Sequence, residues 1–245
     1  MKTTVITCFL SLFLSHFVFA QATDTIPQKK ISVNMDLVSQ YVWRGALLSN
    51  APSIQPSLTY SDKGFSLGVW GATSLAPSDV SEVDLFASYT FKETFTLTLT
   101  DYFITAPEHY FNYQSEKTGH IFELMGSYAN PDLFPLSFTV ATNIYGADAA
   151  KLKKDGSYDG IQYSTYAELG YSFKYCDAFM GFNMTPPNKD RGEVGFYGDS
   201  FGVVNLGVTA TKEIQVTKSF SLPLKASLIT NPQAERVFLV VGLAL

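Results

Sequence analysis

The chain has 245 residues, with 17 lysine or arginine and 22 aspartate or glutamate residues, so its net charge is −5 at neutral pH. A negative net charge argues against general nucleic-acid binding, which needs a basic surface. The two cysteines and three histidines are scattered, which excludes a disulfide framework and disfavours a transition-metal site, so no cofactor is expected.

The first twenty residues have the features of a cleaved secretory signal peptide. Lys2 supplies a positive start, residues 5–19 are apolar, and Val18-Phe19-Ala20 is a cleavage site of the usual kind. The apolar stretch is too short for a membrane-spanning helix. We therefore expect residues 1–20 to be removed, residues 21–30 to form a flexible lead, and residues 31–245 to form one domain.

From residue 31 onward, runs of alternating apolar and polar residues predict β-strands. In the first run Ile31 and Val33 fall on one face of a strand, and Ser32 and Asn34 fall on the other. Most runs have about nine to eleven residues, the length that a tilted strand needs to cross a bilayer. The twelve predicted strands are residues 31–44, 53–61, 64–73, 81–91, 94–104, 119–129, 136–146, 161–173, 177–184, 200–211, 218–229 and 236–245.

The connections between these runs alternate in length. The short ones are residues 61–63, 92–93, 130–135, 174–176 and 212–217, whereas the long ones are residues 45–52, 105–118, 147–160 and 185–199. This pattern is typical of an antiparallel transmembrane β-barrel with both termini in the periplasm and the long loops outside. We therefore expect an all-β barrel of about twelve strands in the outer membrane.

Aromatic residues make up 15% of the chain and gather near the predicted strand ends. Such positions suit the two aromatic belts of a membrane barrel. A secreted β-sandwich or a lipocalin-like soluble barrel shares the alternation, but twelve strands with two kinds of connection disfavour it. The expected belt residues are Tyr41, Trp43, Tyr60, Phe65, Tyr89, Phe91, Phe95, Phe103, Tyr171 and Phe173.

Several short motifs follow one another in residues 35–85. They are Tyr41, Trp43-Arg44-Gly45, Pro52-Ser53-Ile54-Gln55, the segment 64–70 ending in Gly68-Val69-Trp70, and the acidic strand start Glu82-Val83-Asp84-Leu85. In these motifs the chain resembles the amino-terminal signature of the TorF-like porin family. The resemblance implies an outer-membrane barrel of porin type, without a particular solute.

Charged residues on the inward faces of the strands predict two walls of opposite charge. The cationic wall comes from neighbouring strands at the barrel closure, and the anionic wall from the strands beyond it. The predicted constriction consists of Arg44, Lys225 and Arg236 facing Glu82, Asp84, Glu123 and Glu168. Such rows create a transverse field that tunes ion selectivity, unless the groups pair with one another or with water.

The number of strands bears on the width of the pore. About eight strands are filled by side chains and sixteen leave an aqueous channel, so twelve predict a narrow or loop-plugged pore. Inward aromatic side chains would narrow it further, and the candidates are Trp70, Phe86, Phe179 and Phe201.

We expect a channel, not an enzyme, with outer-membrane lipid and small polar solutes as partners. An alternative is a non-conducting barrel with a binding or structural role through outer loops that carry residues 110–113 and Phe196-Tyr197. A lipid hydrolase is a weaker alternative. Gly198-Asp199-Ser200-Phe201-Gly202 matches a nucleophile motif, but a strand follows it instead of a helix. Neither His109 nor His120 has sequence support as a partner for Ser200.

Overall fold

The computed structural model describes residues 30–76, 80–104, 109–115, 117–218 and 220–245. The predicted signal peptide and nearly all of the lead lie outside the described residues. The long barrel strands are β1 Ile31–Val38, β4 Ser53–Asp62, β5 Phe65–Ser74, β6 Ser81–Phe91, β7 Phe95–Phe103, β8 His120–Asn130, β9 Phe134–Gly146, β12 Thr165–Ser172, β13 Asp177–Asn183, β14 Gly202–Thr217, β15 Phe220–Asn231 and β16 Arg236–Ala244.

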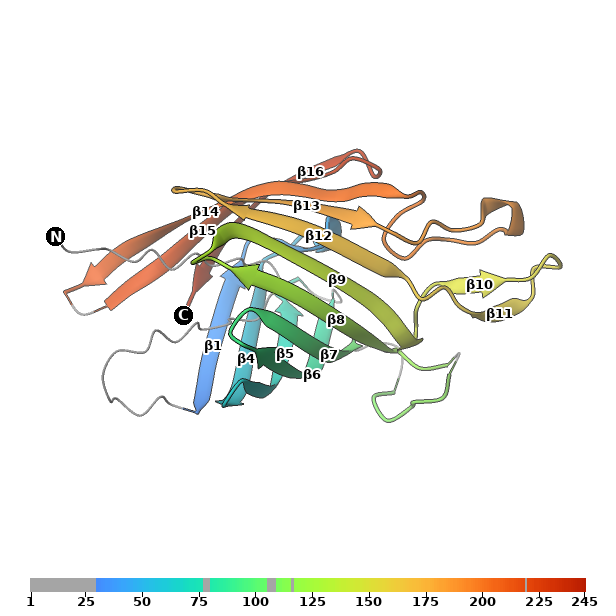
Figure 1. Cartoon of the computed structure of the whole chain (residues 1–245), viewed down its shortest axis with the longest axis horizontal. Coiled ribbons are helices and arrows are strands. Elements are labelled where there is room, and N and C mark those ends of the chain that lie inside the picture. The colour runs from blue at the N-terminus through green and yellow to red at the C-terminus, as the bar shows by residue number, and fades with distance from the viewer. Residues whose placement is uncertain (1–29, 77–79, 105–108, 116, 219) are drawn as a thin grey trace.

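These twelve strands close into one antiparallel barrel, in the order β1-β16-β15-β14-β13-β12-β9-β8-β7-β6-β5-β4 (Figure 1). The predicted fold class is therefore confirmed. The connections after β4, β6, β8, β12 and β14 lie at one end of the barrel, the short-turn end, together with the first residue of β1 and the last residue of β16. The long loops lie at the other end, the loop end, which also carries the short turn 232–235 between β15 and β16. No helix formed by the described residues is long and apolar enough to cross a bilayer.

Four shorter strands form two small hairpins at the loop end. One hairpin consists of β2 Tyr41–Trp43 and β3 Ala46–Ser49, and the other of β10 Ala150–Leu152 and β11 Tyr158–Ile161. A single turn of 3₁₀-helix, Lys189–Arg191, lies in the loop between β13 and β14. The predicted long loop 147–160 thus contains paired strands, and the strand predicted from residue 161 begins at Thr165.

The barrel strands alternate between an apolar outer face and a mixed, largely polar interior. In β6, Val83 and Leu85 are exposed on the outside, whereas Glu82, Asp84 and Phe86 are buried inside. This is the alternation on which the sequence prediction rested. Exposed aromatic side chains gather toward the short-turn end, as predicted for Tyr60, Phe65, Tyr89, Phe91, Phe95, Tyr171 and Phe173.

Three of the predicted belt residues lie elsewhere. Tyr41 and Trp43 belong to the β2–β3 hairpin. Phe103 is buried, because the rings of Tyr110 and His120 pack against it, 5.1 and 4.6 Å away between ring centroids. The belt prediction is therefore wrong for these three residues.

The predicted turn at residues 212–217 is wrong, because β14 continues to Thr217 and pairs there with Phe220. Pairing of β14 with β13 ends at Thr209, so the last part of the β14–β15 hairpin extends beyond its neighbour (Figure 1). Ile214 and Val216 alternate with polar residues in this segment. This alternation and the β-propensity of Ile214 and Val216 favour continuation of the strand.

The predicted first strand, residues 31–44, is wrong beyond Val38. After two bend residues the chain forms β2, and the predicted loop 45–52 contains β3. Trp43 pairs with Ala46, and the two residues between them, Arg44 and Gly45, both have positive φ angles of 47° and 79°. Positive φ at both central positions is the mark of a tight type I′ hairpin turn.

Candidate pore lumen and internal hairpin

The β2–β3 hairpin lies inside the barrel, against several walls at once. Val42 is buried in an apolar cluster with Ile229 of β15 and Phe238 of β16. At the turn, the Asn231 side-chain amide donates a hydrogen bond of 3.2 Å to the Gly45 carbonyl. A Cβ atom on Gly45 would lie 2.0 Å from the carbonyl oxygen of Val204 in β14. The hairpin therefore occupies the loop-side half of the lumen.

Arg44 extends from the hairpin turn to the opposite wall. Its Nη2 donates to Glu123 Oε1 of β8 at 3.0 Å, and its Nη1 donates to Glu123 Oε2 and, at 2.6 Å, to the Tyr197 hydroxyl. The Tyr102 hydroxyl donates to Glu123 Oε1 at 3.0 Å. The Glu123 carboxylate therefore has a bidentate guanidinium partner and further hydrogen-bond donors, which a buried charge requires.

The surroundings of Arg44 also favour its charged form. The guanidinium carbon lies 4.7 Å from the ring centroids of Trp43 and Tyr166, a cation–π distance. Burial works against the charged form, but the Glu123 carboxylate raises the pKa of Arg44 above its ordinary value. Arg44 therefore stays cationic within the barrel.

A second contact fastens the base of the hairpin to β6. The Tyr41 hydroxyl donates to Glu82 Oε2 at 2.7 Å, and Glu82 and Asp84 point inward from alternate positions of the strand. Burial, and then the Glu82 carboxylate, raises the pKa of Tyr41 well above its ordinary value. Tyr41 therefore remains a hydrogen-bond donor. Asp84 accepts the backbone N–H of Phe103 at 3.3 Å.

The three predicted cations do not form one wall. Arg44 lies at the hairpin turn, not on the first barrel strand, because β1 ends at Val38; its predicted wall position is wrong. Arg236 is exposed at the start of β16, at the loop end. Lys225 pairs in register with Gly242, close to the other end of β16.

The four predicted anionic residues all lie on barrel strands and point inward. Glu82 and Asp84 on β6 and Glu123 on β8 are buried, and Glu168 on β12 is partly buried. Glu168 accepts hydrogen bonds from the Tyr166 hydroxyl and, at 3.1 Å, from the Asn205 amide. The sequence left two arrangements open, facing rows of charge or pairing of the charged groups with one another. Arg44 and Glu123 form such a pair.

The inward aromatic side chains lie along the wall. A Cβ atom on Gly68 would lie 2.5 Å from the Phe86 ring, and one on Gly207 would lie 2.5 Å from the Phe179 ring. Each ring thus covers a glycine of the neighbouring strand. Trp70 packs edge-on against Tyr41, with 5.9 Å between ring centroids. Phe201 precedes β14 and is 62% exposed, so its predicted inward strand position is wrong.

Sequence reasoning missed several polar residues of the lumen, namely Tyr102, Tyr166, Asn205 and Asn231, and it named Tyr197 only as a residue of an outer loop. Tyr102, Tyr166 and Asn231 occupy inward positions of the alternation, so the period of two was a usable signal for them. Tyr197 lies in the loop between β13 and β14. Its contact with Arg44 depends on that loop folding inward, and strand periodicity carries no information about this.

The geometry does not assemble the hydrolase considered above. The ring nitrogens of His120 lie 2.8 Å from Asp101 Oδ1 and 2.5 Å from the Tyr110 carbonyl oxygen. His120 is thus held by partners other than Ser200. Within the described ranges, no group of three or more His, Cys, Asp or Glu side chains is placed to hold a metal ion.

Solved structures similar to this chain include other barrels. The KdgM porin has a TM-score of 0.44 at 10% identity, over 86% of this chain and 96% of that one. A triple mutant of the Rhodopseudomonas blastica porin has a TM-score of 0.38 at 13% identity, over 79% of this chain and 55% of that one. BamA from Haemophilus ducreyi lacking POTRA domains 1–3 has a TM-score of 0.33 at 14% identity, over 82% and 41%.

Curated proteins contain no match to the chain. One protein-family model does match the chain. Residues 21–172, more than half of the chain, match the model of Gcw_chp, whose description is a bacterial protein of unknown function, and the chain belongs to this family.

Proposed function

We propose that the chain is an outer-membrane channel of porin type, through which small polar solutes diffuse passively. Every strand of the closed barrel has a neighbour on both sides, over all or part of its length, and the outward side chains are mostly apolar, as a bilayer favours. The predicted signal peptide and the resemblance to the TorF-like porin family support the same location. The short-turn end with both termini then faces the periplasm, and the long loops face outward.

The observation that carries this proposal is the β2–β3 hairpin within the lumen. It is fastened by polar contacts to β6, β8 and β15, through Tyr41, Arg44 and Gly45. A hairpin that narrows a polar lumen acts as a constriction, and it sets which solutes pass by size and charge. The residues proposed to shape the passage are Arg44, Lys225, Arg236, Glu82, Asp84, Glu123 and Glu168.

The charge of this lumen favours cations. Arg44 is neutralised by Glu123. Among the residues proposed to shape the passage this leaves three carboxyl groups, Glu82, Asp84 and Glu168 on β6 and β12, and two cations, Lys225 and Arg236 on β15 and β16. Anionic side chains in a low-dielectric passage attract cations and repel anions. We therefore expect a channel with weak cation selectivity.

A planar bilayer containing residues 21–245, with a salt gradient across it, tests the proposal. The decisive variant removes the constriction. Val38 and Ser53 are direct partners in the β1–β4 ladder. Residues 39–52 can thus be replaced by a two-residue Asn-Gly turn that joins the strands. We expect small, discrete, cation-selective steps from the wild type and several-fold larger steps from this variant.

A matched control shortens a hairpin outside the lumen. Leu152 and Tyr158 are partners in the β10–β11 hairpin, so residues 153–157 can be replaced by the same Asn-Gly turn. We expect wild-type conductance from this control. Equal conductance in all three proteins would reject the hairpin as the constriction.

One observation favours the second candidate function, a non-conducting barrel that acts through its outer loops. Glu123, Asn143 and Asn183 are fully buried, so the loop-side interior is tightly filled at these positions. Folded wild type and folded Asn-Gly variant that are both silent in the bilayer would favour this role over the channel.

A further inference from the structure

The barrel wall is incompletely paired where its first and last strands meet. β1 and β16 share three residue pairs, from Asp36 with Ala244 to Val38 with Gly242. Further hydrogen bonds extend this pairing at both ends. Met35 and Leu245 exchange two backbone hydrogen bonds of 3.1 and 2.9 Å, and the Ser39 N–H donates to the Val241 carbonyl at 2.8 Å. The Val241 N–H donates to Ser39 Oγ at 3.0 Å. By contrast, β15 pairs with β16 along its length, up to Asn231 with Arg236. The cause is the inward turn of the chain after Val38.

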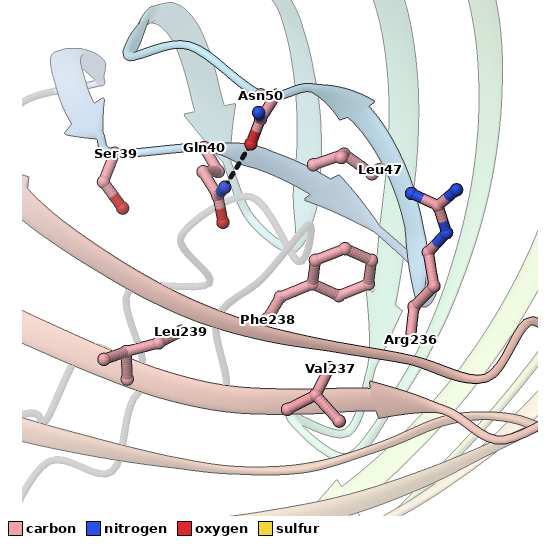
Figure 2. A pocket seen from close by; sticks show the side chains of 8 residues that line it. All are labelled: Ser39, Gln40, Leu47, Asn50, Arg236, Val237, Phe238 and Leu239. Atoms are coloured by element: carbon pink, nitrogen blue, oxygen red, sulfur yellow. Dashed lines mark hydrogen bonds between the residues drawn. The ribbon is translucent and has the colours of Figure 1, made fainter.

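Between Arg236 and Val240, the edge of β16 that faces β1 therefore has no strand partner among the residues that the structure describes. A cavity of about 760 Å³ lies along this edge (Figure 2). It is lined by residues 236–239 of β16 and by residues of the hairpin and its base, which include Gln40, Leu47 and Asn50.

The residues of β16 that line the cavity come from both faces of the strand. Val237 and Leu239 are 67% and 66% exposed on the outer face, whereas Phe238 between them is 6% exposed and packs in the interior. All three line the same cavity. Consecutive side chains of a strand point to opposite faces, so a cavity that contacts all of them follows the strand edge from one face to the other. We name this cavity, which has residues from both faces of β16 in its lining, the seam opening.

The seam opening combines apolar and cationic groups. Leu47 and Phe238 give it an apolar inner side, and Figure 2 shows the Phe238 ring between the hairpin and β16. Arg236 is exposed, and within the described residues it has no ion-pair partner. The amides of Gln40 and Asn50 bond to each other across the hairpin base. This set of groups complements a molecule with an apolar chain and an anionic head.

We propose that the seam opening binds an anionic lipid of the surrounding bilayer, with its headgroup on Arg236 and one acyl chain against Leu47, Phe238 and Leu239. Arg236 is the first residue of β16 at the loop end, where the headgroups lie if the barrel spans the membrane as proposed. Guanidinium groups bind phosphate oxygens with paired, charge-assisted hydrogen bonds. The opening faces lipid because Val237 and Leu239 belong to the apolar outer face.

This inference rests on the proposed membrane location, and photolabelling in vesicles tests it. The probe is phosphatidylglycerol with a diazirine in one acyl chain, at low content in phosphatidylcholine vesicles that hold the full barrel. Phosphatidylcholine with the same diazirine is the neutral comparison. We expect the anionic probe to label residues 39–50 and 236–239 about tenfold more than the neutral probe, as a hydrogen bond to a charged group predicts.

Two arginine variants make the result specific. Arg236→Gln is expected to remove the preference for the anionic probe while the barrel stays folded, since the side chain is exposed. Arg191→Gln, in an outer loop where Arg191 donates to the Leu152 carbonyl, is the matched control and is expected to keep the preference. Heat-dependent mobility on a gel checks that each variant is folded.

Labelling that spreads evenly around the outer face of the barrel would overturn the inference, and so would a preference for the anionic probe that survives Arg236→Gln. Conductance measured on the same proteins separates this result from the fate of the channel proposal. Conducting channels without seam labelling reject only the lipid site, whereas silent barrels with seam labelling reject only the channel. Protein that does not enter the vesicles rejects the membrane location itself.

Discussion

Arg44 and Glu123 are 79 positions apart in the sequence, yet the two guanidinium nitrogens of Arg44 bind the two carboxylate oxygens of Glu123 inside the barrel. The side chains are 10% and 0% exposed. A complete buried pair contributes little net free energy, but breaking it leaves an uncompensated charge. The pair therefore makes docking of the β2–β3 hairpin sensitive to the loss of either partner.

Glu123→Gln is expected to destabilise the docked hairpin by about 3 kcal/mol, because Arg44 then lies buried without its counter-charge. The double variant with Arg44→Gln is expected to recover most of this loss. Denaturant unfolding and single-channel conductance measure both effects, and the weakened hairpin is expected to give larger or more variable steps. Glu213→Gln, on the exposed extension of β14, is the control. Double and single variants with equal losses would contradict the pairing.

The sequence pattern predicted the twelve barrel strands because each strand separates two different environments. In β6 the alternation of Glu82, Asp84 and Phe86 with exposed Val83 and Leu85 is complete, and the predicted bounds 81–91 agree with the structure. The acidic residues of the predicted strands 81–91, 119–129 and 161–173 point into the barrel for the same reason. A period of two determines the face of a residue once the strand is known.

The hairpin was not predicted, because its strands are short and its turn carries no strong signal. Arg44 adopts a positive φ, which is uncommon for arginine, and only Gly45 suggested a turn. The alternation does fail at Val38, Ser39 and Val42, where the chain leaves the wall. That break marked the end of β1, but it did not show that the chain turns inward. The sequence placed Arg44 opposite four acidic residues that include Glu123, but which of them binds it depends on this turn and was not predicted.

Gly45→Ala is expected to undock the hairpin turn. The added Cβ would lie 2.0 Å from the Val204 carbonyl oxygen, and the φ of 79° is itself unfavourable for alanine, by about 1–2 kcal/mol. Gly156→Ala is a matched control, because Gly156 has a φ of 81° and no atom within 4 Å of the added Cβ. We expect higher conductance from Gly45→Ala only. If both variants lose the same stability and conduct alike, the close approach to β14 has no role.

Gly68→Ala is expected to push the Phe86 ring away from the wall and into the lumen. The added Cβ would lie 2.5 Å from the ring and 2.8 Å from the Leu58 carbonyl oxygen, so overpacking is expected to cost about 1–3 kcal/mol. The displaced ring is expected to lower the conductance. In Gly126→Ala the nearest atom lies 3.6 Å away, in the Phe95 ring, so this control is expected to conduct normally. Unchanged conductance in folded Gly68→Ala would show that Phe86 does not border the solute path.

Glu193 joins two outer loops, and its contribution is expected to depend on pH. Its carboxylate accepts the backbone N–H groups of Leu152 and Asn188 at 3.0 and 2.8 Å. These hydrogen bonds, first that from Leu152, lower the pKa of Glu193 below its ordinary value. A carboxyl whose pKa is lower in the folded state contributes stability above its unfolded pKa of about 4.3, and this is lost as the pH falls through the folded value.

The amide resonances of Leu152 and Asn188 in a micelle-bound barrel measure this effect. They are expected to shift together as the pH falls, with a midpoint below about 4.3, and to lose this titration in Glu193→Gln. Glu193 is partly exposed to solvent, which makes the free-energy change small, so the shift of the midpoint is a better measure than the unfolding temperature. Glu235→Gln, in the turn before β16, is expected to leave the titration unchanged. A midpoint at or above about 4.3 in the wild type would mean that the two loops do not hold the ionised carboxylate.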